Sequence, residues 1–347
     1  MPTHGYTTAA GRINEIKGEI LAHAIPIEVL ALGCTMKKMP TNEGDNITYR
    51  RWLPFGATAA TIHTQNRPVV VAASHLVAEG VTPTADVLTP VDVNVVIQQY
   101  ACLYSYTDKA AELYEDDIPE EMKTQTGERM GLVREMIRYG SLKAGTNVLY
   151  SGGTSRVTVD EAITLKVLRR MTRTLKLNHA KLKTRVLGAS PNYNTNAIEA
   201  GYIVFVSTDA EPDVRDLPDF TKVANYANRQ PINEHELGSV ENFRFITSPE
   251  LTAYADAGAA VGATGLFSTT GTSIDVYPFI IMGEEAAFDV ALRGANSFDV
   301  THLPHKQKDK SDPLGQRGYV GASFWDAVLV TNQGWMGVIE AGVTTQT

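Results

Sequence analysis

The acidic segment 209–216, DAEPDVRD, comes closest in this chain to the spacing of a metal-binding loop. Its first three acids alternate with other residues, as the oxygen ligands of a calcium loop do. Such a loop needs glycine at its sixth position and a bidentate glutamate at its twelfth, but these positions hold Val214 and Phe220. We therefore expect a polar turn with helix-capping acids and no calcium site.

Histidine spacing gives a second, weaker indication of metal binding. His302 and His305 are three residues apart, but Pro304 lies between them in a polar segment without a carboxylate that could orient either ring. We expect both to be surface histidines. His23 lies in a short amphipathic segment, where a hydrogen-bonded interfacial histidine is a simpler interpretation than a metal ligand.

Signatures of the common enzyme classes are missing from the sequence. It contains no GxSxG, GxxxxGK[ST], HExxH or GxGxxG pattern. Gly258, Gly262 and Gly265 are spaced wrongly for a dinucleotide-binding turn, and a flexible loop explains them better. The sequence therefore predicts a protein that is not an enzyme, with no catalytic, cofactor-binding or metal-binding residues and no cofactor.

Composition is that of a folded protein with room for two domains: 347 residues, 43% hydrophobic and 20% charged. Cys34 and Cys102 lie far apart, which favours a reducing compartment over a disulfide framework. The first residues lack the pattern of a signal peptide, and no apolar run is long enough to span a membrane, so we expect no membrane partner. The net charge of −8 argues against a general nucleic-acid binder.

The distribution of charge is more informative than its sum. Segment 162–198 contains no acidic residue, and acidic blocks flank it at 112–121 and 209–219. Its basic residues are Lys166, Arg169, Arg170, Arg173, Lys176, Lys181, Lys183 and Arg185. Such segregation can make opposite edges of two copies attract each other, although independent solvated faces are the plain alternative. The basic segment 166–185 could face DNA or a neighbour's acidic edge, and we favour the edge.

Two long elements dominate the predicted architecture. Residues 91–108 alternate as one strand of about 50 Å, and residues 117–142 follow as a helix with Pro119 in its first turn. Its apolar positions are Met122, Met130, Val133, Ile137 and Tyr139. Gly127 and Gly131 cost about 1 kcal/mol each relative to alanine, which suggests that another backbone passes close to this spine helix.

Residues 54–90 are rich in Ala, Thr, Val, Gly and Pro and have the composition of a long two-stranded excursion with a turn-rich tip. Residues 47–53 alternate as a strand, and VVVAA at 69–73 suggests another within the excursion. A hairpin of this length has too little core to be stable alone, so a neighbouring subunit is its simplest partner. Residues 12–24 have helical apolar spacing and form either an arm on a neighbouring copy or an ordinary docked helix.

The remaining elements are mixed and follow no regular βαβ order, which predicts an α+β fold. A helix is expected at 158–177, with Thr158 and Glu161 as a capping box and an apolar stripe through Ile163, Val167, Met171 and Leu175. Short buried strands are expected at 202–207, 243–247 and 276–282, with Pro278 indicating an edge or a bulge. Further strands should close the chain between 325 and 339, and loops are expected at 257–271 and 302–318.

In order and spacing, the segments resemble the major capsid proteins of tailed double-stranded DNA phages, and more narrowly those of N-four-type podophages. The matching segments are EGVTPT at 79–84, QQY at 98–100, YTD at 106–108, YGSLKAGTNVLY at 139–150, RRMTRTLKLNHAK at 169–181, and further on ASPNYNTNAIEAGYI, DAEPDVRDLPDF and GSVENFRFITSPEL. The resemblance extends from about residue 13 to 343.

This resemblance implies a Hong-Kong-97-like (Johnson) fold. On this mapping, residues 1–46 are an N-terminal arm, and 47–98 hold the extended β-hairpin loop and strands of the peripheral domain. Residues 99–152 complete that domain with the spine helix and long β-sheet. Residues 153–310 form the axial domain, and 311–347 are strands that return to the peripheral sheet.

The implied function is that of a structural major capsid protein, which self-assembles into the icosahedral shell around phage DNA. An encapsulin-like nanocompartment shell is the alternative. The implied partners are other copies in hexamers and pentamers, with portal, scaffolding and decoration proteins as further candidates and DNA held non-specifically. The implied location is the virion capsid, assembled in the host bacterial cytoplasm. Some members of the wider fold link their shells by a lysine–asparagine bond from the hairpin. No lysine lies between Trp52 and Asp108, so we predict no such link here.

Overall fold

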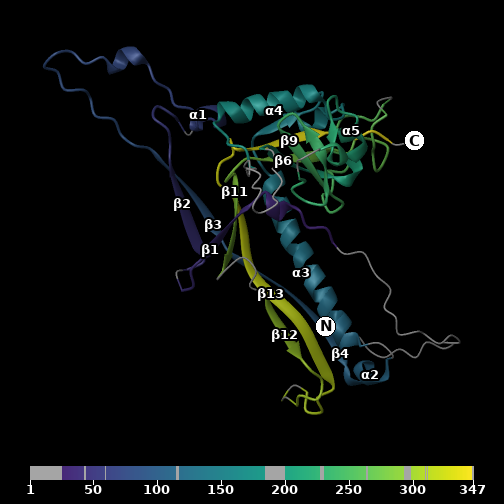
Figure 1. Cartoon of the computed structure of the whole chain (residues 1–347). Helices are drawn as coiled ribbons and strands as arrows, with labels where there is room; N and C mark the ends of the chain where they lie inside the picture. Colours follow the sequence, from purple (N-terminus) through teal and green to yellow (C-terminus); the bar gives the residue numbers. More distant parts are fainter. Residues whose placement is uncertain are drawn as a thin grey trace, which may run out of the picture.

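Two β-sheets and one long helix organise the chain (Figure 1). The computed structural model describes residues 26–345 except 43, 59, 115–116, 184–199, 227–229, 263–264, 293–297, 309 and 311. A seven-stranded sheet forms the upper lobe in Figure 1, a five-stranded sheet extends below it along the helix, and a two-stranded hairpin projects to the side. The helix expected at 12–24 lies outside the described residues.

The seven-stranded sheet is buried on both faces. In spatial order its strands are β5 (Val148–Tyr150), β14 (Met336–Ala341), β10 (Tyr277–Met282), β6 (Tyr202–Ser207), β9 (Phe243–Ser248), β8 (Glu236–Val240) and β7 (Thr221–Lys222). Along β6, Val204 and Val206 pack in one core under α4 (Leu165–Leu177), while Ile203 and Phe205 pack in a second core. The second core also contains Tyr139 and other residues from the end of α3 (Ile118–Lys143). Strands covered on both faces are expected to be nearly all apolar, as the central strands β6 and β10 are.

The five-stranded sheet, called the long sheet below, is built on β13 (Arg317–Val330), a strand of about 45 Å. One edge of β13 pairs with β4 (Gln98–Thr107). The other edge pairs with β11 (Ala287–Leu292) and β12 (Asp299–Leu303), and β1 (Thr35–Met39) pairs in parallel with β11. Helix α3, about 39 Å long, lies along β13 and β4, so the predicted spine helix beside a long sheet is confirmed.

The start of α3 matches its sequence signals, but the interpretation of its glycines was wrong. The Asp117 carboxylate accepts a hydrogen bond from the Glu120 N–H, with a proline in the first turn. Among the described residues, no atom outside the helix would touch a Cβ at Gly127. A Cβ at Gly131 would collide with the Glu28 carboxylate, so this glycine makes room for a side chain and not for a crossing backbone.

The hairpin forms as predicted at its base, where β2 (Asn46–Trp52) pairs with β3 (Pro90–Val96) in antiparallel register. The single long strand expected at 91–108 is instead two strands, β3 and β4, interrupted at Ile97, whose side chain is buried in a core beneath the hairpin. The chain changes sheets at this point, because β3 pairs with β2 and β4 pairs with β13. The VVVAA segment forms no strand; it leads into a short 3₁₀ turn at Ala72–His75.

Helix α4 is shorter than expected. It begins at Leu165 with Thr164 as its N-cap, and Thr158 belongs to a separate 3₁₀ turn, where its hydroxyl accepts from the N–H of Ser155. The capping box expected between Thr158 and Glu161 is therefore wrong. The apolar stripe is confirmed: Ile163, Val167, Met171 and Leu175 are buried in one core.

Strand β10 lies inside its sheet, but Pro278 itself occupies an edge position within that strand, one of the two alternatives expected from the sequence. Pro278 is opposite Glu340 on β14, whereas pairing with β6 begins only at Ile280. The residue without an N–H thus occupies a stretch of β10 with a neighbour on one side only.

Strand membership departs from the expected division of the chain at 310. Strands β11 and β12 precede that boundary yet belong to the long sheet, and β14 follows it yet belongs to the seven-stranded sheet. The return of the last strands to the long sheet therefore holds for β13 alone. Short helices complete the described elements: α1 (Ile62–Gln65), α2 (Asp108–Leu113) and α5 (Glu211–Arg215).

Candidate assembly surfaces

Five charged side chains are buried where α3 crosses the long sheet, and we call them the spine cluster: Arg134, Glu135, Arg138, Asp289 and Asp326. Arg138 donates to Asp289 through Nε at 2.9 Å and Nη2 at 2.7 Å, and to Glu135 at 3.3 Å. Arg134 donates from Nε to Asp326 at 2.9 Å. The cluster joins the helix to β11 and β13 through charge-assisted hydrogen bonds inside the subunit.

Three carboxylates and two arginines share this buried space, and the local electrostatics reflect that imbalance. Burial raises the pKa of Asp326 to about 7, aided by a hydrogen bond and repulsion from Asp289 and opposed by both arginines. Burial also raises the pKa of Glu135, although its Oε1 accepts the N–H groups of Val29 and Leu30, each at 2.7 Å. A shared proton would leave the cluster neutral, which makes its burial less costly.

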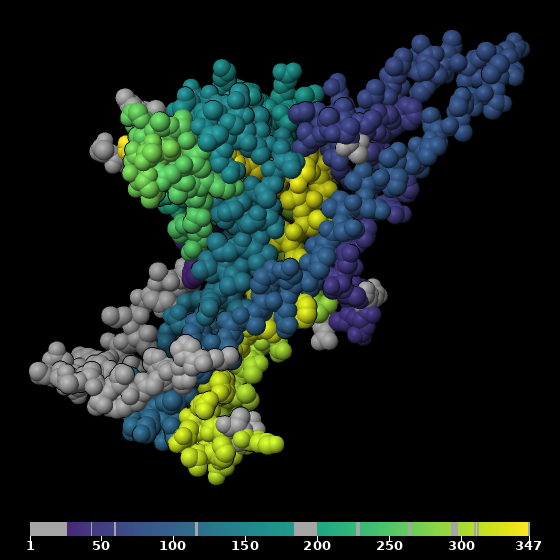
Figure 2. Space-filling view, turned by 180° about the vertical axis from the view of Figure 1, so that it is seen from behind, coloured from purple at the N-terminus to yellow at the C-terminus, as the bar shows by residue number. Residues whose placement is uncertain are grey.

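The extended loop, residues 53–89 between β2 and β3, has the opposite character. It projects from the body at the upper right of Figure 2. Leu76 is 87% exposed and Val87 90% exposed. The other large apolar side chains that the loop exposes are Phe55, Val69, Val70, Val71, Val77, Val81 and Leu88. A contiguous apolar segment held in water marks a surface that another molecule covers.

A polar contact fixes the root of the loop to the body. Asn66 and Asn332 are both buried and exchange side-chain hydrogen bonds of 3.0 and 2.8 Å. Arg51 on β2 donates from Nη1 to the Asn66 side-chain oxygen at 3.0 Å, and burial lowers the pKa of its guanidinium. The loop is thus held where it leaves the body, while its tip makes no comparable contact among the described residues.

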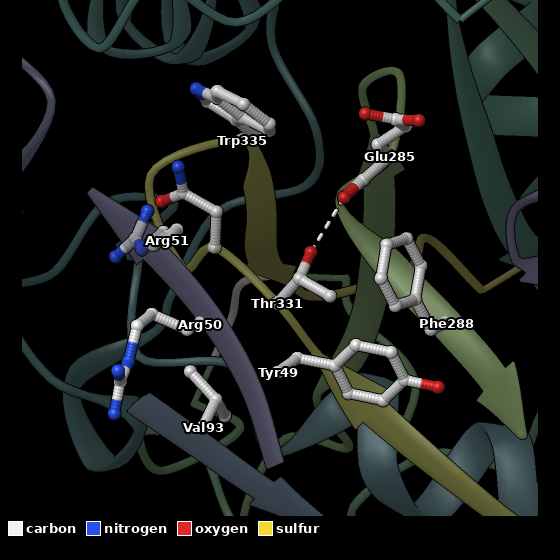
Figure 3. Close-up of a pocket in the computed structure, with 9 residues that line it drawn as sticks. Tyr49, Arg50, Arg51, Val93, Glu285, Phe288, Thr331 and Trp335 are labelled. Carbon is white, nitrogen blue, oxygen red and sulfur yellow. Dashed lines mark hydrogen bonds between the residues drawn. The ribbon is translucent and has the colours of Figure 1, made fainter. Parts of the chain in front are cut away.

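A groove of about 230 Å³ lies beside this root, between the hairpin and the ends of β11 and β13 (Figure 3). Tyr49 from the hairpin meets Phe288 of β11 edge-on, with ring centroids 5.3 Å apart. Thr331 donates to the Glu285 carbonyl at 2.6 Å, and Trp335 lines the groove above them. Three aromatic side chains line the groove together with charged and polar ones, and its lining contains no catalytic pair of an acid and a base.

The first three acids of segment 209–216 each have a partner within the chain. Asp209 accepts from the Tyr277 hydroxyl, Glu211 pairs with Arg215, and Asp213 accepts from Thr344. In the described part of the chain, no group of three or more His, Cys, Asp or Glu side chains could hold a metal ion.

The histidines and cysteines are likewise separate. His302 lies in β12 and His305 beyond it, 3.6 Å from the Glu112 carboxylate, while His23 lies outside the described residues. Cys34 and Cys102 are buried free thiols. None of the helices within the described ranges has the length and apolar composition needed to cross a bilayer.

Comparison with known proteins identifies the arrangement of sheets, spine helix and extended loop. No protein-family profile matches the chain. The major capsid protein of Pseudomonas phage KPP21 is 20% identical over 265 residues, which cover 70% of this chain and 66% of that relative's length. The capsid of Ralstonia phage GP4 matches with a TM-score of 0.66 at 13% identity over 98% of both chains. That of cyanophage Pam1 matches with a TM-score of 0.60 at 15% identity, over 98% of this chain and 99% of its own.

This chain has the fold of phage capsid subunits. The predicted α+β, Hong-Kong-97-like fold is confirmed by these likenesses. For a chain with this fold, the candidate functional surfaces are those that would contact other copies. Sequence reasoning found the extended loop through its lack of a core but missed the spine cluster, since a search for apolar periodicity treats charged positions as solvent-facing.

Proposed function

We propose that this chain is a structural major capsid protein that self-assembles into the icosahedral shell enclosing phage double-stranded DNA. The observation that carries the proposal is the extended loop, whose apolar side chains are exposed in a single subunit of a capsid fold. A neighbouring copy can cover them, and contacts repeated around a closed shell make weak pairwise interactions collectively strong.

The sheets suggest how the domains divide. We assign the long sheet and α3 to the peripheral domain, the seven-stranded sheet and α4 to the axial domain, and residues 1–46 to an N-terminal arm. Copies would form hexamers and pentamers of the shell, in the virion and after assembly in the host bacterial cytoplasm. Portal, scaffolding and decoration proteins are further proposed partners, DNA would be held by non-specific contacts, and the N-four-type group is the proposed subfamily.

Expression of the full chain, followed by sizing chromatography and negative-stain microscopy, tests this function. Shells, tubes or sheets are the expected products. A stable monomer at high concentration, with its extended loop protected from protease, would contradict the proposal. The contents of purified particles separate the two shell functions, because a phage shell holds nucleic acid and a nanocompartment holds an enzyme cargo.

The absence of lysine from residues 53–107 makes a further prediction about the finished shell. Mature particles boiled in denaturing detergent should run as a single band at the 37.7 kDa subunit mass. A ladder of covalent oligomers would show that a lysine elsewhere in the chain forms the crosslink.

A further inference from the structure

The seven-stranded sheet carries opposite charges at its two ends. The Tyr202 hydroxyl at the start of β6 donates to the Ala180 carbonyl, which places the end of α4 there. Asp209 lies two residues after Ser207, where β6 ends, and accepts from the Tyr277 hydroxyl at the start of β10. Six residues of strand therefore separate the two ends, a distance of about 20 Å.

At the first end, α4 presents a basic surface. Arg170, Arg173 and Lys176 are exposed, and among the described residues none of them forms an ion pair. Arg173 and Lys176 line a shallow groove whose floor includes Leu177. Three acids also lie near this end: Glu241, which pairs with Arg169 at 2.6 Å, and Glu284 and Glu285 beyond β10. The cations on α4 exceed what these acids neutralise.

From the second end, α5 and the turn after it carry an acidic surface toward β7, whose Thr221 pairs with Ser239 on β8. Asp216 and Asp219 are exposed, and no ion pair involves either of them within the described ranges. Glu211, by contrast, is paired with Arg215 on the same helix. Beside this surface lies a groove lined by Asp209 and the exposed Phe267. Each end thus offers unpaired charge next to apolar surface.

We infer that the basic surface of α4, through Arg173 and Lys176, docks against the acidic surface at Asp216 and Asp219 of a second copy of this chain. The contact joins two different patches, so it is heterologous and repeats head to tail until a ring closes. Complementary charges would guide each copy into this orientation and disfavour the reversed one. This inference rests on the proposed shell function and names one of its contacts.

Charge reversal at each end tests the contact. We expect Arg173→Glu with Lys176→Glu, and separately Asp216→Lys with Asp219→Lys, to lower the yield of assembled particles at least tenfold in about 0.1 M salt. Combining all four substitutions in one chain should restore assembly, because the two ends attract again with their signs exchanged. In an equal mixture of the two reversed chains, rings with an even number of copies should form by alternation, because each chain then attracts the other at both contacts.

Controls separate this contact from other causes. Lys38→Glu with Lys308→Glu makes the same change in net charge at exposed lysines outside the seven-stranded sheet, and it should assemble normally. Thermal unfolding of unassembled subunits shows whether each variant is folded, which matters for Asp219 because its φ is +63°. If wild-type chains form no particles, the proposed function fails. If wild-type chains assemble but the chain with all four substitutions does not, the proposed function stands and only this inference fails.

DNA is the competing partner of the basic surface, and the same variants identify it. If α4 faces DNA, Arg173→Glu with Lys176→Glu would give particles in normal yield that retain less DNA, and the change at Asp216 and Asp219 would have no effect. That pattern would overturn the inference.

Discussion

The spine cluster and the extended loop reverse the usual placement of polar and apolar groups. In the spine cluster, charged side chains are buried and find their partners within the same subunit. In the extended loop, apolar side chains such as Leu76 and Val87 are exposed to water. The comparison indicates which parts of the subunit are complete in a single chain and which parts, on the proposed function, other copies complete.

The two regions differ in how much a lone chain constrains them. Arg138 bonds Asp289 on β11 and Arg134 bonds Asp326 on β13, so two directional contacts fix α3 against the long sheet. Among the described residues, the extended loop is held to the body near Asn66, and its tip can follow the surface of whatever covers it. A rigid frame with an adaptable edge suits a subunit that must fit neighbours in more than one ring.

Removing one charge from the spine cluster should have the largest effect. Arg138→Met keeps most of the side chain but leaves Asp289 and Glu135 without its guanidinium. Breaking a buried ion pair in this way costs about 3–5 kcal/mol of unfolding free energy. Urea unfolding of the unassembled subunit measures this loss. Arg170→Met, an exposed arginine on α4, is the matched control and should change stability by less than about 0.5 kcal/mol. Equal losses of unfolding free energy for the two variants would mean that the buried cluster stabilises the subunit no more than an exposed arginine does.

Polar substitution in the extended loop should spare the subunit and damage the assembly. Leu76→Asp with Val87→Asp changes side chains that are already in water, so unfolding free energy should stay within about 0.5 kcal/mol of the wild type. Particle yield should fall at least tenfold, because the charges would be buried against a neighbour. Thr82→Asp with Thr84→Asp adds the same charge to the same loop without removing apolar surface, and should assemble better. A lower stability of the Leu76 and Val87 variant would show that the loop packs on its own subunit.

What the sequence predicts here depends on how local each signal is. The apolar stripe of α4 and the buried strand β6 were predicted because their periodicity lies within one element. The spine cluster was missed because its partners, Asp289 and Asp326, are more than 150 residues from Arg138 and Arg134 in the chain. One signal within α3 could nevertheless have revealed the two arginines.

Met130, Arg134, Arg138 and Leu142 recur every four residues and are all buried, so the two arginines lie on the stripe that faces the sheet. The break between β3 and β4 was missed for a different reason. The residues on either side of Ile97 both form strands, and what changes there is the pairing partner, from β2 to β13.

The smallest expected effect is a pH dependence that belongs to the spine cluster alone. The pKa of Asp326 is raised from 3.8 to about 7 by burial and by Asp289, so the folded chain keeps a proton that the unfolded chain has already lost. The folded state binds more protons across this range, so this contribution to stability is fully present below about pH 4 and declines as pH rises through 7. Urea unfolding of wild-type and Asp326→Asn subunits at pH 5 and pH 8 isolates it.

The wild-type subunit should lose more stability than the Asp326→Asn variant between these two pH values. The variant should keep a weaker dependence, because burial also raises the pKa of Glu135. Thr82→Asp with Thr84→Asp, which leaves the cluster intact, should follow the wild type. If wild-type and Asp326→Asn subunits lost equal stability, the buried carboxyl pair would not share a proton, and the cluster would carry its net negative charge at neutral pH. Because the extended loop holds no buried acid among its described residues, this pH dependence reports on the spine cluster and not on the loop.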